Sequence, residues 1–188
     1  MKKHIILLLN AILFFSCSVT KHELNTFQTE KIDNLIENKY FEIKCDWAQP
    51  QVTGSFRQIQ NSGLFPIGSS SSNINISNSN NYFRMKEGRV VANLPYYGEQ
   101  RVGGVYTNNA VAVAFDDVPK NLKISKGKNG NYYIKFNIRS KHKSSEHYKV
   151  NIKLFNNLSS TIYISSSHRS SIEYDGHAKA LVEAQASL

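Results

Sequence analysis

The chain has 188 residues, a formal net charge of +9 and 40% hydrophobic residues. This composition is too apolar for a disordered chain, and the length suits one domain that can fold without disulfides or a metal. No apolar run reaches the roughly 20 residues that a membrane-spanning helix requires. The sequence does not reveal a specific activity, but it indicates where the protein is sent and how it is built.

Residues 1–16 are typical of an export signal. Lys2 and Lys3 form a basic start, and an apolar segment at residues 5–15 is followed by Ser16-Cys17. Residues 13–17, LFFSC, resemble a bacterial lipobox, in which the chain is cut before a cysteine that carries lipid; Phe14 stands where leucine is usual. The alternative is a secreted protein cleaved nearby. We expect a lipoprotein signal peptide, with Cys17 anchoring the protein to the outer membrane of a Gram-negative cell envelope.

Residues 17–39 predict a tether and one short amphipathic helix. Thr20 and Glu23 have the spacing of a capping box. Apolar residues then recur at helical spacing as far as Ile36, so we place the helix at residues 22–38.

The period changes to two at Phe41. Odd positions are apolar and even positions are charged as far as Trp47, which predicts a half-buried strand with Cys45 and Trp47 on its inner face. A buried thiol has a raised pKa, which argues against a nucleophilic role for Cys45. Because Cys17 would carry lipid, Cys45 has no cysteine left for an internal disulfide.

Residues 68–83 contain no charge and are rich in serine and asparagine. We predict an exposed, mobile segment here, with a short edge strand at 73–77. A hairpin is expected around Glu87-Gly88, with Pro95 ending its second strand. Residues 110–115 are apolar on both faces, which predicts a central strand.

The rest of the chain predicts an antiparallel meander. Asn129-Gly130 is typical of a type I′ hairpin turn, and the strands around it alternate regularly. The fold class is therefore mainly β, with about eight to ten strands in a barrel or sandwich. The β domain covers residues 40–177, and a small, weakly helical tail covers 178–188.

Several short motifs together resemble a known family. They are the strand at 41–47 with Ala48-x-Pro50, the hexapeptide NLPYYG at 93–98, the glycine pair at 103–104, and the ending RSSIEYDG at 169–176. In this order, and with the lipobox, they resemble an uncharacterised family of small envelope lipoproteins, domain of unknown function 4251. The resemblance spans roughly residues 40–177 and implies no activity, so it supplies no catalytic residue.

Motifs of enzymes are not found in the sequence. It has no Gly-x-Ser-x-Gly elbow and no Walker loop, and its late histidines, at 142, 147, 168 and 177, lack the spacing of a zinc pair. We therefore expect a protein that is not an enzyme and uses no metal or other cofactor.

Basic residues are concentrated between positions 120 and 153. This segment contains nine lysines and one arginine but a single acidic residue, Glu146. Strand alternation places Lys135, Arg139, Lys149 and Lys153 on the outer face. This face is either simply solvated or attracts anionic lipid or acidic polysaccharide. Nucleic acid is not an expected partner, because the aromatic residues alternate inward. The sequence leaves the oligomeric state open.

Three hypotheses for function follow. The leading one is a binding or structural module that acts through its surface, with Tyr96 and Tyr97 at the barrel rim as candidate binding residues. The first alternative is a lipocalin-type carrier of a small apolar ligand, which would have an interior cavity above roughly 300 Å³. The second is a hydrolase whose serine and histidine meet only in space, at about 3 Å.

Overall fold

The computed structural model of the chain describes residues 26–52, 66–102 and 112–181. The lipobox, the capping box and the glycine pair at 103–104 lie outside these residues. The predicted helix is confirmed from Thr26 onward, and the fold class is mainly β. The elements are α2 (Thr26–Asn38), β1 (Tyr40–Pro50), β2 (Ile74–Asn75), β3 (Tyr82–Lys86), β4 (Arg89–Pro95), β5 (Ala112–Asp117), β6 (Lys120–Lys126), β7 (Tyr132–Arg139), β8 (His147–Leu154), β9 (Ser159–Ser166) and β10 (Ile172–Ala180).

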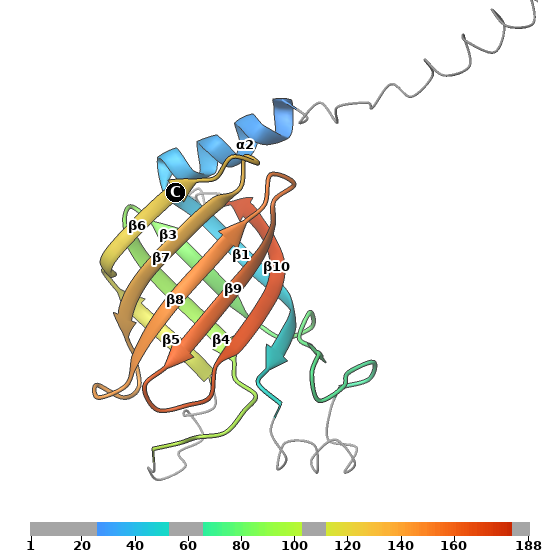
Figure 1. Cartoon of the computed structure of the whole chain (residues 1–188), viewed down its shortest axis with the longest axis vertical. Helices are drawn as coiled ribbons and strands as arrows, with labels where there is room; N and C mark the ends of the chain where they lie inside the picture. Colours follow the sequence, from blue (N-terminus) through green and yellow to red (C-terminus); the bar gives the residue numbers. More distant parts are fainter. Residues whose placement is uncertain (1–25, 53–65, 103–111, 182–188) are drawn as a thin grey trace, which may run out of the picture.

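The strands form one antiparallel sheet that curls into a half-barrel (Figure 1). Its order is β5-β4-β3-β1-β10-β9-β8-β7-β6, and β2 pairs with β1 outside this path. Most neighbours are consecutive hairpins, as the meander prediction requires. The exception is β1, which pairs with β10 over nearly its whole length, from Phe41–Ala180 to Pro50–Ile172.

A β-bulge in β1 overturns the predicted position of Trp47. Cys45 pairs with Gly176 and Trp47 pairs with Asp175, so Asp46 is an extra residue in β1. Because side chains alternate strictly, one extra residue exchanges the faces. Phe41, Ile43 and Cys45 are buried as predicted, but Trp47 turns to the outer face and Ala48 becomes the buried residue.

The polar segment before β3 is also different from the prediction, since part of it belongs to the core. Ile74 and Ile76 are buried. The Asn81 side chain bridges the bulge: its Oδ1 accepts from Cys45 N–H at 2.9 Å, and its Nδ2 donates to Cys45 O at 2.9 Å. The uncharged composition of this segment therefore reflects packing against β1.

Strand β5 is apolar on both faces, as predicted, but it ends the sheet order and is not central. Its outer edge is covered by other groups. Lys141 N–H donates to Ala114 O at 2.8 Å, and Arg169 Nη1 donates to Ala112 O at 3.2 Å. Residues of two loops thus occupy this edge of β5 in place of a second neighbouring strand.

The two predicted hairpins form at the expected places. Glu87 and Gly88 both have positive φ, as a type I′ turn requires. At the second hairpin only Gly130 has positive φ, and Gly127 N–H bonds to Asn131 O, so this is a longer loop and not a type I′ turn. The tail prediction is wrong at residues 178–180, which extend β10.

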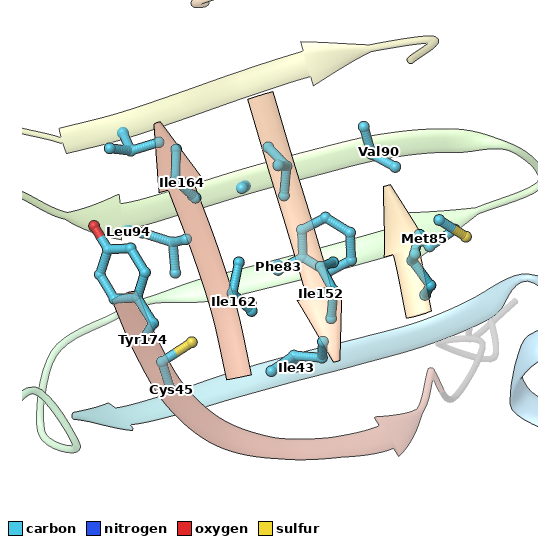
Figure 2. Close-up of a cluster of buried hydrophobic side chains, with 14 of the residues drawn as sticks. Ile43, Cys45, Phe83, Met85, Val90, Leu94, Ile152, Ile162, Ile164 and Tyr174 are labelled. Carbon is cyan, nitrogen blue, oxygen red and sulfur yellow. The ribbon is translucent and has the colours of Figure 1, made fainter. Parts of the chain in front are cut away.

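The concave face of the sheet is filled by side chains. Figure 2 shows residues from β1, β3, β4, β8, β9 and β10 pointing into one cluster. Phe83, Phe115 and Phe136 lie together at its centre, with ring centroids 6.1–6.3 Å apart. The helix α2 covers one end of the half-barrel with Ile32, Leu35 and Ile36. Within the described residues no helix is both long and apolar enough to span a membrane.

Candidate functional site

The hexapeptide at 93–98 forms a corner at the end of the half-barrel opposite α2, which we call the rim. Pro95 ends β4, and the buried Tyr96 reaches the connection between β9 and β10. The Tyr96 hydroxyl lies 2.8 Å from Ser170 Oγ and 3.0 Å from Glu99 O. A Cβ on Gly98 would lie 2.6 Å from both Ser170 Oγ and the Tyr96 hydroxyl, so any other residue there would displace this hydrogen-bonded pair.

A buried ion pair lies beside this corner. Arg169 Nε is 3.0 Å from Glu146 Oε1, and its Nη2 donates to Glu146 Oε2 at 3.2 Å. Ser166 Oγ donates to the same carboxylate at 2.6 Å, and the guanidinium carbon lies 5.1 Å from the Tyr96 ring centroid. The pair is bidentate and almost fully buried, so the two side chains hold each other in one orientation.

The polar groups at the rim are bonded mainly to one another. Burial raises the pKa of Tyr96, and burial also raises the pKa of Tyr97, which is half-buried beside it. The Tyr174 hydroxyl donates to Pro95 O at 2.9 Å. These hydrogen bonds hold the end of the core in place. Of the two candidate tyrosines, Tyr96 is hydrogen-bonded, and Tyr97 makes no side-chain hydrogen bond to the described residues. A binding role for either tyrosine stays a prediction.

The four candidate basic residues do share the outer face of β7 and β8. Lys135, Arg139 and Lys149 are exposed, and Lys153 is half-buried with its Nζ 4.4 Å from the Phe155 ring centroid. Across the β7–β8 pair the four lie opposite Asn151, His147, Asn137 and Tyr133, respectively, and on the β6 side Lys135 lies opposite Lys123. None of them has an ion-pair partner among the described residues. We call these four residues the basic surface.

Comparison with known proteins identifies the family. The family model for a domain of unknown function, DUF4251, matches residues 23–178. The chain belongs to the DUF4251 family. A crystal structure of a DUF4251 family protein from Bacteroides eggerthii is similar to this chain, with a TM-score of 0.54 and 15% sequence identity over 82% of this chain and 88% of the other. No curated protein matches the chain. The resemblance inferred from the motifs is therefore confirmed.

The DUF4251 chain also brings a serine and a histidine together at the rim. Ser145 Oγ is 3.3 Å from His168 Nε2 on the exposed surface, and Ser167 Oγ is 2.7 Å from His168 Nδ1. In a Ser-His-Asp triad the second ring nitrogen faces a carboxylate that stabilises the imidazolium. Here it faces a neutral hydroxyl, which cannot supply that charge.

Two further kinds of site were considered in this DUF4251 domain, a reactive thiol and a metal centre. Burial, together with the nearby Asp46 and Asp175 carboxylates, raises the pKa of the Cys45 thiol to about 12, so the thiolate is strongly disfavoured. In the part of the chain that the structure describes, no three His, Cys, Asp or Glu side chains are grouped to hold a metal ion.

Sequence reasoning missed the Glu146–Arg169 pair. Two signals were available: Arg169 opens the ending at 169–176, and Glu146 is the single acid between residues 120 and 153. Neither signal indicates the partner, because the two residues come from different loops.

Proposed function

We propose that this protein is a lipid-anchored module of the cell envelope that binds anionic lipid head groups through its basic surface and catalyses no reaction. The observation that carries the proposal is the presence of four cations on two adjacent strands without an acidic partner among the described residues. Each cation near an anionic membrane contributes about 1 kcal/mol of attraction. A sheet face that serves only solubility can carry acidic residues beside its basic ones.

The expected anchor supports this choice of partner over acidic polysaccharide. Cys17 precedes Thr26, the first residue of α2, by nine residues. A chain of that length spans at most about 30 Å, so a lipid on Cys17 would keep the domain beside the membrane. The basic surface extends along β7 and β8 away from the α2 end, and it could lie flat on the head groups.

The anchor is tested by Cys17→Ala in the full-length chain. The variant should appear in the soluble fraction after cell breakage in high salt, whereas the unaltered protein should sediment with membranes. A variant that stays in the membrane fraction in high salt contradicts the lipoprotein assignment.

The basic surface is tested with the same Cys17→Ala protein and vesicles that contain phosphatidylglycerol. The double charge reversal Lys135→Glu/Lys149→Glu should weaken vesicle binding by at least about thirtyfold. A control with Lys86→Glu/Lys141→Glu makes the same change in charge at exposed positions off the basic surface. Binding that is equally weakened in the control, or that occurs only to acidic polysaccharide, overturns the proposal.

A second candidate function is a serine hydrolase. One observation favours it, the contact between Ser145 Oγ and His168 Nε2. A fluorophosphonate probe separates the two proposals. Labelling that Ser145→Ala abolishes and Ser144→Ala preserves would establish a reactive serine. We expect no labelling, because His168 has a hydroxyl in place of a carboxylate at Nδ1.

A further inference from the structure

Aromatic side chains gather on the outer face of β9, β10 and β1, where a solvated sheet surface normally carries small or charged residues. The bulge at Asp46 turns Trp47 to this face, and Tyr163 on β9 is 41% exposed. Phe155, at the end of β8, lies on the same side. Tyrosine and tryptophan in such positions are typical of binding surfaces, because each has an apolar face and a polar tip.

Two cavities lie next to these rings. The first has a volume of about 620 Å³ and is lined by Tyr163, Gln49, Glu173 and Arg101, among others. The second has a volume of about 240 Å³ and is lined by Trp47, Phe155, Asp175 and His177, among others. The first is within the size range of small-molecule sites.

The sheet register makes the two cavities neighbours. Tyr163 pairs with Glu173, which pairs with Gln49. Thr161, Asp175 and Trp47 form the adjacent outward-facing row. Ordinary strand spacing then places the Cα atoms of Trp47 and Tyr163 about 12 Å apart, with Asp175 between them.

Asp175 is held in place before any ligand arrives. Gln49 Nε2 donates to its Oδ2 at 2.7 Å, and Thr161 Oγ1 donates to its Oδ1 at 2.8 Å. An ionised carboxylate has about four acceptor positions, so each oxygen keeps capacity for another hydroxyl. A fixed acceptor costs less ordering free energy on binding than a mobile one.

We propose that this face is a binding site for oligosaccharides that lack acidic groups, with Trp47 and Tyr163 as stacking platforms and Asp175 as the hydroxyl acceptor. One face of a pyranose ring is made of C–H groups and fits the electron-rich face of an aromatic ring. Its equatorial hydroxyls point sideways, toward carboxylate and amide groups. The site goes beyond the proposed lipid contact and is centred on β1, β9 and β10, with Lys153 of the basic surface at its border.

The carboxylates around the acceptor Asp175 disfavour acidic sugars at that position. Glu173 and Asp175 lie in adjacent rows, and burial together with Asp175 raises the pKa of Glu173. Asp46 lies at the other side of the second cavity, 3.1 Å from His177. A uronic acid or sulfated sugar placed against Asp175 would meet these carboxylates. Two cations border the face: Arg101 lines the first cavity, and Lys153 pairs with Thr161 beside the second.

Trp47 is the single tryptophan of the chain, so its fluorescence reports directly on this site. The full-length protein in detergent is titrated with chitohexaose, with cellohexaose and with an oligogalacturonate of equal length. We expect a saturable change in emission with at least one neutral probe and a much weaker response to the oligogalacturonate. No saturable change with either neutral probe, or equally tight binding of the oligogalacturonate, overturns the proposal.

Variants localise the effect. Tyr163→Ala should weaken binding of the responding probe roughly tenfold, and Asp175→Asn should weaken it as well. Tyr133→Ala is the matched control, because Tyr133 is an outer-face tyrosine of similar exposure on β7, outside both cavities. If Tyr163→Ala does not fold, Tyr163→Ile removes the ring and keeps a strand-forming residue. Unchanged affinity in the folded Tyr163 variant, or equal loss in Tyr133→Ala, contradicts the site.

Discussion

At the scale of single residues, Gly176 shows how closely β1 and β10 approach each other. It pairs with Cys45 at the bulge, and a Cβ at this position would overlap the carbonyl oxygen of Lys44. The second contact, 2.7 Å to Cys45 Cα, is also backbone, which cannot move aside as a flexible side chain can. The bulge therefore depends on a glycine in the partner strand.

Gly176→Ala is expected to destabilise the fold by roughly 3 kcal/mol, because β1 and β10 must separate to admit one methyl group. Thermal or urea unfolding measures the loss. Gly68→Ala is the control, since Gly68 has φ +82° and open space around it. In that variant the free energy of unfolding should fall only by the cost of placing alanine in the left-handed region, about 1 kcal/mol. Equal losses in the two variants would show that the close approach is not important.

The Glu146–Arg169 pair leads to a second prediction. Glu146→Gln or Arg169→Met leaves one buried charge without its partner, which costs about 3–5 kcal/mol. The double variant should lose clearly less than the sum of the two single losses, because it leaves no unpaired charge. A double-mutant cycle by urea unfolding tests this. Additive losses would mean that the two side chains do not act as a unit.

At the scale of elements, Asp33 helps to dock α2 on the sheet through polar contacts beside the apolar residues of the helix. Asp33 accepts hydrogen bonds from Lys126 Nζ at 2.6 Å and from the Tyr132 hydroxyl at 2.8 Å. The hydrogen bond from Lys126 holds the pKa of Asp33 below its ordinary value, although desolvation acts in the opposite direction. The contact joins the helix to β6 and β7.

A lowered carboxyl pKa stabilises the folded state above the unfolded-state pKa, and the contribution disappears as the pH falls through the folded-state pKa. Asp33→Asn should therefore increase hydrogen exchange of the α2 amides at pH 7. The difference from the unaltered protein should shrink as the pH falls below the ordinary carboxyl pKa and disappear once Asp33 is protonated in the folded state. Glu37→Gln, an exposed position on the same helix, is the control and should leave exchange unchanged. A difference that persists in acid would rule out the ionised Asp33 as its cause.

Strand faces were predictable from the sequence wherever pairing is regular. Alternation placed Ile134, Ile152 and Ile162 inward, and the structure buries all three. It failed at Trp47, because a bulge depends on the partner strand and leaves no mark on its own strand's pattern. At the segment before β3 the predicted short strand is present as β2, but the predicted exposure was wrong, because Ile74 and Ile76 are buried beside β1.

The rim was predictable in part. Pro95 and Gly98 mark a corner after β4 by their backbone requirements, so Tyr96 could be placed at the end of the core. Its partner Ser170 lies 74 positions later in the sequence, in a serine-rich stretch where nothing distinguishes one hydroxyl from another. The outer-face aromatic residues were not predicted for a related reason: Trp47 was assigned to the core.

At the scale of the whole molecule, the packed interior bears on the carrier hypothesis. Phenylalanines from β3, β5 and β7 meet at its centre, α2 covers one end and the rim network covers the other. We expect native mass spectrometry of the protein extracted from its envelope to show no bound apolar molecule. A small apolar ligand that survives extraction would instead support a carrier and require the core to open.

The pairing of β1 with β10 has a consequence for how the protein is made. Phe41 pairs with Ala180, so β1, the first strand of the domain, cannot complete its pairing until β10, the last strand, is available. Contacts of such long sequence separation slow folding, because loop closure must precede the gain from pairing. A ribosome-bound or partly translocated chain that lacks β10 cannot complete the sheet. Under the proposed export route this delay is useful, since the chain would stay unfolded until the whole of it has crossed the membrane.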